Sequence, residues 1–173
     1  MDFQILGENA LKIKIKKTTL ALDPKSVTPK FDADAILILE KDADVSRINN
    51  PRVVINGAGE YEVSGLKVSG LKAEDDYIYE LSIDSVNTLV ARASSLGKFS
   101  ADKLDDYKVV VINVDIDLDQ TKVTAMEPSL IILYGEKAKE GAKALGKEDA
   151  SMSSKISVSE DKLPEELEIM LLG

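Results

Sequence analysis

The sequence predicts an α/β fold in which helices cover a largely buried β-sheet. The first half of the chain alternates apolar and polar residues in short segments, which is typical of a β-meander. Continuous apolar runs of strand length follow at 109–114 (VVVINV) and 130–134 (LIILY), and such runs indicate strands buried on both faces. Segments of helical composition separate these runs. A meander followed by β-α-β-α units favours layered α/β packing.

The first half of the chain contains the meander. Residues 10–17 (ALKIKIKK) alternate lysine with apolar residues, which predicts an amphipathic edge strand with one solvated face. A strand at 18–23 follows after room for only a tight turn, and Pro24 and Pro29 then favour a loop at 24–30. The other strands predicted in this half are two buried ones, 35–39 (AILIL) and 52–56 (RVVIN), short strands within 57–71, and a hairpin of 77–83 with 87–93 that turns at Asp84 and Ser85.

The second half alternates helices with strands. Besides the two apolar runs, the predicted elements are helices at 100–107, 117–128 and 136–146, and one or two strands within 154–172. Ser100 is a favourable N-cap for the first helix, Pro128 ends the second, and Gly146 closes the third. No composition shift marks a linker in the 173 residues, so a single domain, 1–173, is expected.

Composition excludes several classes of function. The chain has no histidine and no cysteine, so imidazole catalysis, Ser-His-Asp triads, histidine- or thiolate-bound zinc and disulfides are ruled out. A net charge of −9 argues against a nucleic-acid partner, because phosphate binding needs clustered Lys and Arg. No apolar run is long enough to span a membrane, and the N-terminus lacks the order of a signal peptide. A cytoplasmic protein without a membrane partner is therefore expected.

Two clusters of alternating carboxylates follow buried strands. They are Glu40, Asp42 and Asp44 after 35–39, and Asp115, Asp117 and Asp119 after 109–114. Alternation in an extended segment puts such side chains on one side, and Ca²⁺ or Mg²⁺ takes oxygen ligands. An EF-hand-like loop needs more ligands and a turning glycine, which these segments lack. The competing interpretation is that these carboxylates are solvated and serve as helix caps and for solubility.

Six blocks in order along the chain carry a family resemblance. They are FQILGENALKIKIKKTTLALDP at 3–24, ADAILIL at 33–39, NPRVVINGAGEYEVSGLKVSGL at 50–71, VVVINV at 109–114, MEPSLIILY at 126–134 and KISVSEDKLPEELEIMLL at 155–172. Together they resemble the metallo-β-lactamase-fold hydrolases, and above all a small bacterial subgroup of zinc-dependent hydrolases. The third block is the most specific match. The resemblance implies a four-layer αββα sandwich with its active site at one edge, where strand ends meet.

The departures from the family concern its metal ligands. The family's His-x-His-x-Asp-His motif falls on Glu40, Asp42, Asp44 and Val45, its next histidine on or near Arg92, its bridging aspartate near Ser95, and its last histidine around Gly135. Among these former metal-ligand positions, only Asp44 keeps the family residue. The resemblance therefore implies that the dinuclear zinc centre is lost, and no metal or other cofactor is expected.

Two structural expectations accompany this loss. Only 45–49 (VSRIN) separates Asp44 from the next block, and only 72–76 (KAEDD) remains of a loop beside the site, which predicts a reduced pocket. We also hypothesise that Arg92 fills the space of a metal ligand and forms a salt bridge with Asp44.

The function expected from these observations is non-catalytic. The chain is predicted to be a pseudoenzyme that serves as a protein-binding or assembly module, as a homo-oligomer or with a protein partner. The alternative is a metal-dependent hydrolase with a repurposed carboxylate site for a hard cation. A third possibility, a small-molecule binder that uses the former active-site pocket, is attached to no particular residue.

Overall fold

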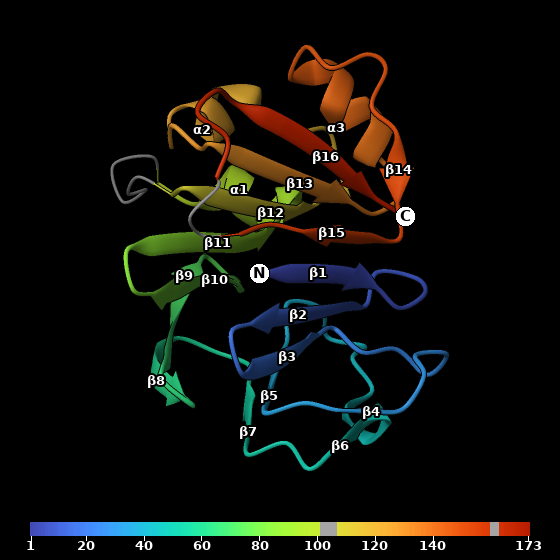
Figure 1. Ribbon diagram of the computed structural model, residues 1–173, viewed down its shortest axis with the longest axis vertical. Helices are drawn as coiled ribbons and strands as arrows, with labels where there is room; N and C mark the ends of the chain where they lie inside the picture. The colour runs from blue at the N-terminus through green and yellow to red at the C-terminus, as the bar shows by residue number, and fades with distance from the viewer. Residues whose placement is uncertain (101–106, 160–162) are drawn as a thin grey trace.

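The computed structural model describes residues 1–100, 107–159 and 163–173, and within these ranges most strands belong to two large sheets (Figure 1). The first sheet has six strands in the order β15 (Lys155–Ser157), β1 (Asp2–Ile5), β2 (Leu11–Ile15), β3 (Thr18–Leu22), β5 (Ala35–Leu37) and β7 (Val53–Ile55). The second has eight in the order β14 (Met152–Ser153), β16 (Glu168–Leu172), β13 (Leu130–Tyr134), β12 (Val109–Asn113), β11 (Val86–Arg92), β10 (Asp76–Ile83), β9 (Leu66–Ala73) and β8 (Gly59–Val63).

The main apolar core lies between the two sheets. Ile13 of β2 and Leu20 of β3 pack there with Val111 of β12 and Ile132 of β13, all fully buried. The next residue along β12, Val110, is equally buried but belongs to a second cluster on the other face of its sheet. Successive side chains of a strand point to opposite faces, so the apolar runs predicted to be buried on both faces are confirmed.

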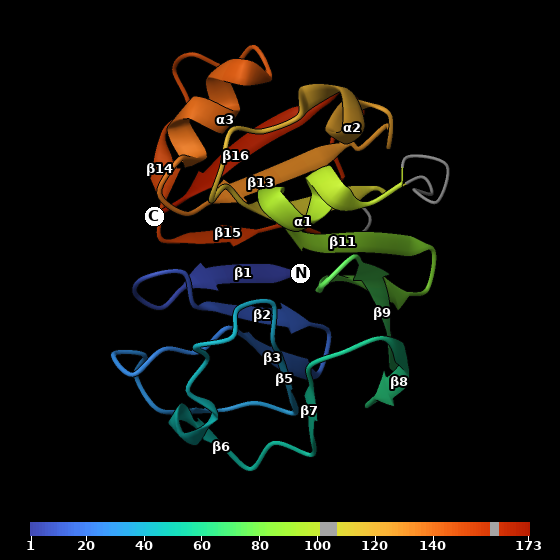
Figure 2. The same ribbon diagram turned by 180° about the vertical axis from the view of Figure 1, so that it is seen from behind.

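Helices cover the outer face of the eight-stranded sheet. They are α1 (Ala93–Lys98), α2 (Gln120–Thr124) and α3 (Ala138–Ala144) (Figure 2). The second apolar cluster lies between these helices and the sheet. The cluster includes Leu96 of α1, Val123 of α2 and Ala142 of α3. None of the helices in the described ranges is long and apolar enough to cross a membrane.

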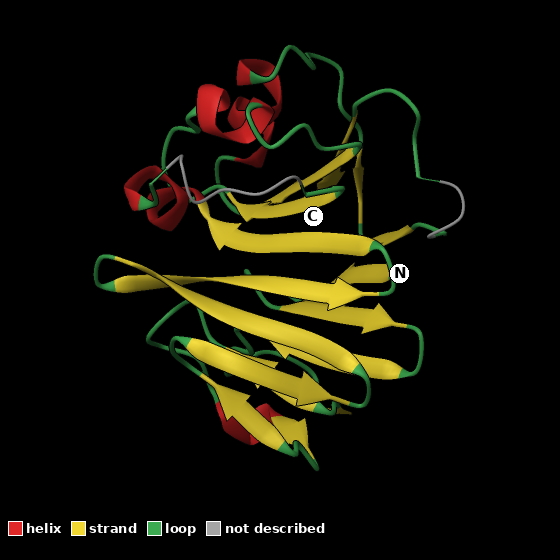
Figure 3. Cartoon of the chain, turned by 90° about the vertical axis from the view of Figure 1, so that its left-hand side faces the viewer, coloured by secondary structure: helices red, strands yellow, loops and turns green. Residues whose placement is uncertain are grey.

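The outer face of the six-stranded sheet has a much thinner cover. In the described residues it consists of a 3₁₀ turn, η1 (Val45–Arg47), and a two-stranded ladder of β4 (Phe31–Asp32) with β6 (Ile48–Asn49). Figure 3 shows the α-helices gathered on one side of the strands and this short turn on the other. A small cluster that includes Ile36 and Ile48 lies under the cover. The layered α/β sandwich is thus confirmed, with one outer layer reduced to a turn and a ladder.

Two strand predictions need correction. The lysine-rich strand β2 is amphipathic as expected, but it pairs with both β1 and β3 and is not an edge strand. The strand predicted at 52–56 is β7, which pairs only with β5 in the described residues, so it lies at an edge and Val54 is 41% exposed. The hairpin around Asp84 and Ser85 is confirmed, since β10 and β11 pair there with Ile83 opposite Val86.

The helix predictions are less accurate. The helix predicted over 117–128 is only α2, which begins after its N-cap Asp119 and ends at Thr124. The helix predicted over 100–107 lies largely outside the described residues. Helix α1 was not predicted, because the sequence pattern extended the preceding strand through Ala93, where the helix begins.

Parallel pairing brings many strand ends to one edge of the molecule. In the first sheet β3, β5 and β7 are parallel, and in the second β11, β12, β13 and β16 are parallel. The segments that follow these strands therefore meet, and they carry most of the positions singled out from the sequence.

Candidate functional site

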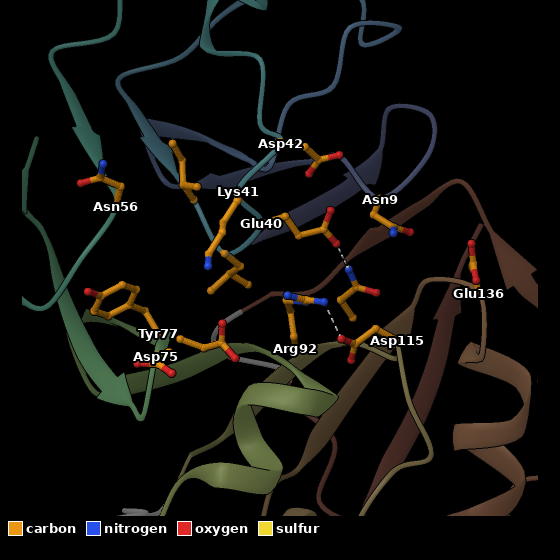
Figure 4. Close-up of a pocket in the computed structure, with 14 residues that line it drawn as sticks. Asn9, Glu40, Lys41, Asp42, Asn56, Asp75, Tyr77, Arg92, Asp115 and Glu136 are labelled. Carbon is orange, nitrogen blue, oxygen red and sulfur yellow. Dashed lines mark hydrogen bonds and ion pairs between the residues drawn. The ribbon is translucent and has the colours of Figure 1, made fainter.

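A cavity of about 870 Å³ opens where these strand ends meet (Figure 4). Among the described side chains that line it are six carboxylates, those of Glu40, Asp42, Asp75, Asp76, Asp115 and Glu136. Its volume lies in the range of small-molecule sites. A cavity of that size is therefore present even though the segments 45–49 and 72–76 beside the site are short. A second hollow of about 490 Å³ adjoins it and includes Lys25 and Gly135.

A lysine ammonium lies between two of the carboxylates. Lys25 follows β3, and its Nζ donates to Oε2 of Glu40 and, at 2.5 Å, to Oδ1 of Asp42. The Lys25 side chain is only 7% exposed and that of Glu40 15%, whereas that of Asp42 is 75% exposed. Burial lowers the pKa of Lys25, but the hydrogen bonds to Asp42 and Glu40 outweigh it and raise that pKa above its usual value. The ammonium of Lys25 lowers the pKa of Asp42 in return.

Glu40 is held from two further directions. Nδ2 of Asn113, at the end of β12, donates to Oε1 of Glu40 over 2.9 Å. Oδ1 of Asp23 accepts from the backbone N–H groups of Leu39 (2.7 Å) and Glu40 (2.9 Å). The Glu40 carboxylate, which follows β5, therefore contacts both Lys25 after β3 and Asn113 at the end of β12. These contacts join the two sheets.

Beneath this network lie buried polar atoms that lack a hydrogen-bond partner among the described residues. They include Oδ2 of Asp23, Oδ1 of Asn113 and the hydroxyl of Tyr134. Burial raises the pKa of Asp23 to about 7, against the lowering effect of its two backbone hydrogen bonds. Burial likewise raises the pKa of Tyr134 well above its usual value. Buried polar groups without a protein partner are ordinarily satisfied by water or a ligand.

Arg92 pairs with Asp115, so the hypothesis that it pairs with Asp44 is wrong. One terminal nitrogen of Arg92 lies 2.7 Å from Oδ2 of Asp115, as the dashed line in Figure 4 shows. Asp115 also accepts from the backbone N–H of Ser94 (3.0 Å) and its hydroxyl (2.5 Å), at the start of α1. Burial raises the pKa of Asp115, but the hydrogen bonds from Ser94 and the charge of Arg92 lower it further, below its usual value.

The carboxylate of Asp44 has a local role at the start of η1. Its Oδ1 accepts from the backbone N–H (3.1 Å) and the hydroxyl (2.7 Å) of Ser46 and so caps η1, which contains the 42%-exposed Val45. Neither Asp44 nor Val45 lines the cavity. Asp119 caps α2 in the same way. The interpretation of the acidic clusters as caps is confirmed for these two aspartates, while Glu40, Asp42 and Asp115 do line the cavity.

Ser95 and Gly135, the other positions predicted to be former metal ligands, do not line the 870 Å³ cavity. Ser95 is buried within α1, and its hydroxyl has no partner among the described residues. Gly135 has φ +95°, and a Cβ at this position would overlap Oδ1 of Asn113. The backbone at 135 therefore leaves no room for a side chain unless Asn113 moves.

Sequence reasoning missed Lys25 and Asn113. Lys25 lies in a segment interpreted only as a loop, and Asn113 ends an apolar run that predicted a strand and nothing more. The only local signal was a polar residue directly after or at the end of a buried strand. Their partner, Glu40, is 15 residues away from the first and 73 from the second, a separation that no local pattern reports.

The residues at this site do not fit a dinuclear zinc centre such as that of the hydrolase family that the sequence resembles. Protein zinc centres are built mainly on imidazole or thiolate ligands, with carboxylates in addition, and the chain has neither histidine nor cysteine. Glu40 and Asp42 already bind the Lys25 ammonium, and Arg92 brings a second positive charge to the cavity. Among the described residues, no group of three carboxylates is close enough together to hold a metal ion.

Comparison with solved structures shows the metallo-β-lactamase fold. A protein of Thermotoga maritima described as a Zn-dependent hydrolase of the metallo-β-lactamase superfamily is similar with a TM-score of 0.77 and 14% identity, over 99% of this chain and 98% of that one. The metallo-β-lactamase fold protein YhfI from Bacillus subtilis is similar with a TM-score of 0.58 and 6% identity, over 99% and 96%. No protein-family model and no curated protein sequence matches the chain. At these identities the similarity shows the fold alone.

Proposed function

We propose that this protein is a non-catalytic relative of the metallo-β-lactamase-fold hydrolases and serves as a protein-binding or assembly module. The observation that carries the proposal is the salt-bridge network at the strand ends. Glu40 and Asp42 are engaged by Lys25, and Asp115 by Arg92 and Ser94. The groups best placed to bind a metal or activate water are thus committed to one another, which favours a structural use of this edge over a catalytic one.

The second candidate is a hydrolase that holds a hard cation on carboxylates. The six carboxylates that line the cavity favour it, because Mg²⁺ and Ca²⁺ are bound through oxygen. The two candidates predict different metal contents for the purified protein.

Metal analysis of protein purified without chelators tests the non-catalytic role. We expect substoichiometric Zn²⁺, Mn²⁺ and Mg²⁺, and no turnover of ester or phosphodiester reporters when these ions are added. Stoichiometric metal that is lost in Asp42→Ala or Glu40→Gln would overturn the proposal in favour of the hydrolase.

Strand β7 is the surface that we propose for assembly. An edge strand offers unpaired backbone groups for pairing with another chain, and Val54 of β7 is 41% exposed. If the chain self-associates, we expect Val54→Lys to reduce its mass in light scattering. If it binds a protein partner, we expect Val54→Lys to reduce the amount of that partner captured from native lysate. Val27→Lys is the control, because Val27 is 57% exposed in the 24–30 loop. A chain that stays monomeric and whose partner capture is unchanged by Val54→Lys contradicts this role.

A further inference from the structure

The position of Lys25 is unusual for a lysine. It follows a buried strand, its side chain is 7% exposed, and its ammonium contacts two carboxylates that both follow β5. A buried ammonium is costly unless carboxylates neutralise it, and two nearby carboxylates repel each other unless a cation lies between them. Lys25, Glu40 and Asp42 therefore stabilise one another.

Two buried polar residues hold Glu40 in place beside the ammonium. Asp23 contacts the backbone of Glu40, and Asn113 contacts its carboxylate. Both residues are fully buried, and each has an oxygen, Oδ2 of Asp23 and Oδ1 of Asn113, without a hydrogen-bond partner among the described residues. Oδ1 of Asn113 lies against Gly135, so the oxygens that face the ammonium are those of Glu40 and Asp42. Carboxylate oxygens are of the type that hard divalent cations prefer.

We propose that the Lys25 ammonium is a built-in substitute for a metal ion, and that its removal converts the Glu40–Asp42 pair into a binding site for a hard divalent cation. The cation would take the place of Nζ between the two carboxylates. Water would complete its coordination, as is common for Mg²⁺ bound through one or two carboxylates. Because the Asp42 side chain is 75% exposed, a cation can reach this position from solvent.

This inference rests on the proposed non-catalytic function, since it takes the wild-type chain to have exchanged a metal for a lysine. It adds that the exchange is reversible by one substitution. The second cation of the site, Arg92, is bound to Asp115 and is left in place in the test.

Lys25→Met tests the inference, since methionine keeps an unbranched apolar stem and removes the charge. Lys41→Met is a charge-matched control, because Lys41 lines the same cavity, where Figure 4 shows it beside Glu40, and is exposed. The melting temperature is measured in EDTA and in Mg²⁺, Mn²⁺ or Ca²⁺, and stoichiometry by calorimetry. We expect no cation-dependent shift in the wild type or Lys41→Met. Lys25→Met should melt lower in EDTA and gain roughly 5–10 °C at a cation concentration about 100-fold above its Kd.

The double variant Lys25→Met with Glu40→Gln shows whether the cation binds at this pair, and it is expected to lose the response. A folded Lys25→Met that binds no cation overturns the inference, as does a response that survives Glu40→Gln. If Lys25→Met does not fold in EDTA, refolding with a divalent cation supports the inference. Failure of both Lys25→Met and Lys25→Gln to fold with any of the three cations overturns it. Stoichiometric metal in the wild type contradicts the proposed function instead, so the two failures are distinguishable.

Discussion

The side-chain amide of Asn113 donates a 2.9 Å hydrogen bond to Glu40, and this contact joins the two sheets at the edge where their strands end. Asn113 ends β12 of the eight-stranded sheet, and Glu40 follows β5 of the six-stranded sheet. A second bridge lies deeper, where the hydroxyl of Tyr79 donates to the backbone carbonyls of Ile38 (2.9 Å) and Ile55 (3.0 Å). Polar contacts thus hold together an edge at which the apolar core between the sheets ends.

Glu40→Ala should destabilise the protein, because it leaves the buried Lys25 ammonium with only the exposed Asp42 and leaves Nδ2 of Asn113 without its acceptor. Breaking a buried ion pair by removing one partner costs about 3–5 kcal/mol, and because Asp42 remains we expect about 2–4 kcal/mol from urea denaturation followed by circular dichroism. Glu136→Ala, at the exposed rim of the same cavity, should change little. Equal effects of the two substitutions contradict the role assigned to Glu40.

Gly135→Ala tests the close contact between Gly135 and Asn113. Alanine at φ +95° is strained, and its Cβ would also overlap Oδ1 of Asn113. Gly146→Ala is the matched control, since Gly146 has φ +84° but no described heavy atom lies within 4 Å of the Cβ position. We expect both to destabilise by about 1 kcal/mol through strain, and Gly135→Ala by about 1–3 kcal/mol more through the overlap. In an Asn113→Ala background, where the overlapping atom is absent, Gly135→Ala should cost no more than Gly146→Ala, and a larger cost there places the effect elsewhere.

The strands could be predicted because their signal is local. In β12 and β13 every residue is buried, and a run such as VVVIN shows this directly in the sequence. The lysine face of β2 likewise shows which of its sides is solvated. What could not be predicted is a strand's place in its sheet, because the alternating pattern of β2 and the apolar run of β7 do not report which strands lie beside them.

The site was predictable in position but not in its contacts. The carboxylates after β5 and β12 indicated the correct edge, because the ends of parallel strands meet. The choice between Asp44 and Asp115 as partner of Arg92 depends on side-chain directions after two different strands, which the sequence does not report. Helix α1 was missed for a similar reason: its first turn is capped by Asp115, a residue 21 positions away from Ser94.

Asp115→Ala should weaken the start of α1 as well as the Arg92 pair. It removes the acceptor of the Ser94 N–H and hydroxyl and leaves the partly buried guanidinium without that carboxylate. Loss of a helix cap costs about 1 kcal/mol and loss of a partly buried charge partner adds to it, so we expect about 2–3 kcal/mol in chemical denaturation. Amide hydrogen exchange at Ser94 should also become faster. Asp117→Ala is the control, since Asp117 is an exposed carboxylate bound to Lys137, and it should leave both measurements unchanged.

The last prediction concerns pH and Asp23. Its pKa is raised from 3.8 to about 7 in the folded protein, so between these values the folded state holds a proton that the unfolded state has released. Stability then falls as pH rises through this window, because the unfolded state binds fewer protons. One unit of pKa difference corresponds to about 1.4 kcal/mol, so the total loss is on the order of a few kcal/mol. Asp42 and Asp115, whose pKa values are lowered, act in the opposite direction and only below about pH 4.

Asp23→Asn isolates this effect, because its side-chain oxygen can still accept from the N–H groups of Leu39 and Glu40 while the titrating group is gone. We expect urea denaturation from pH 5 to 8 to show wild-type stability falling with pH and the Asp23→Asn curve to be flatter. The two curves should diverge most between pH 5 and 7 and run parallel above about pH 8, where Asp23 is ionised in both states. Parallel curves across the whole range, or wild-type stability that rises with pH, contradict a buried and protonated Asp23.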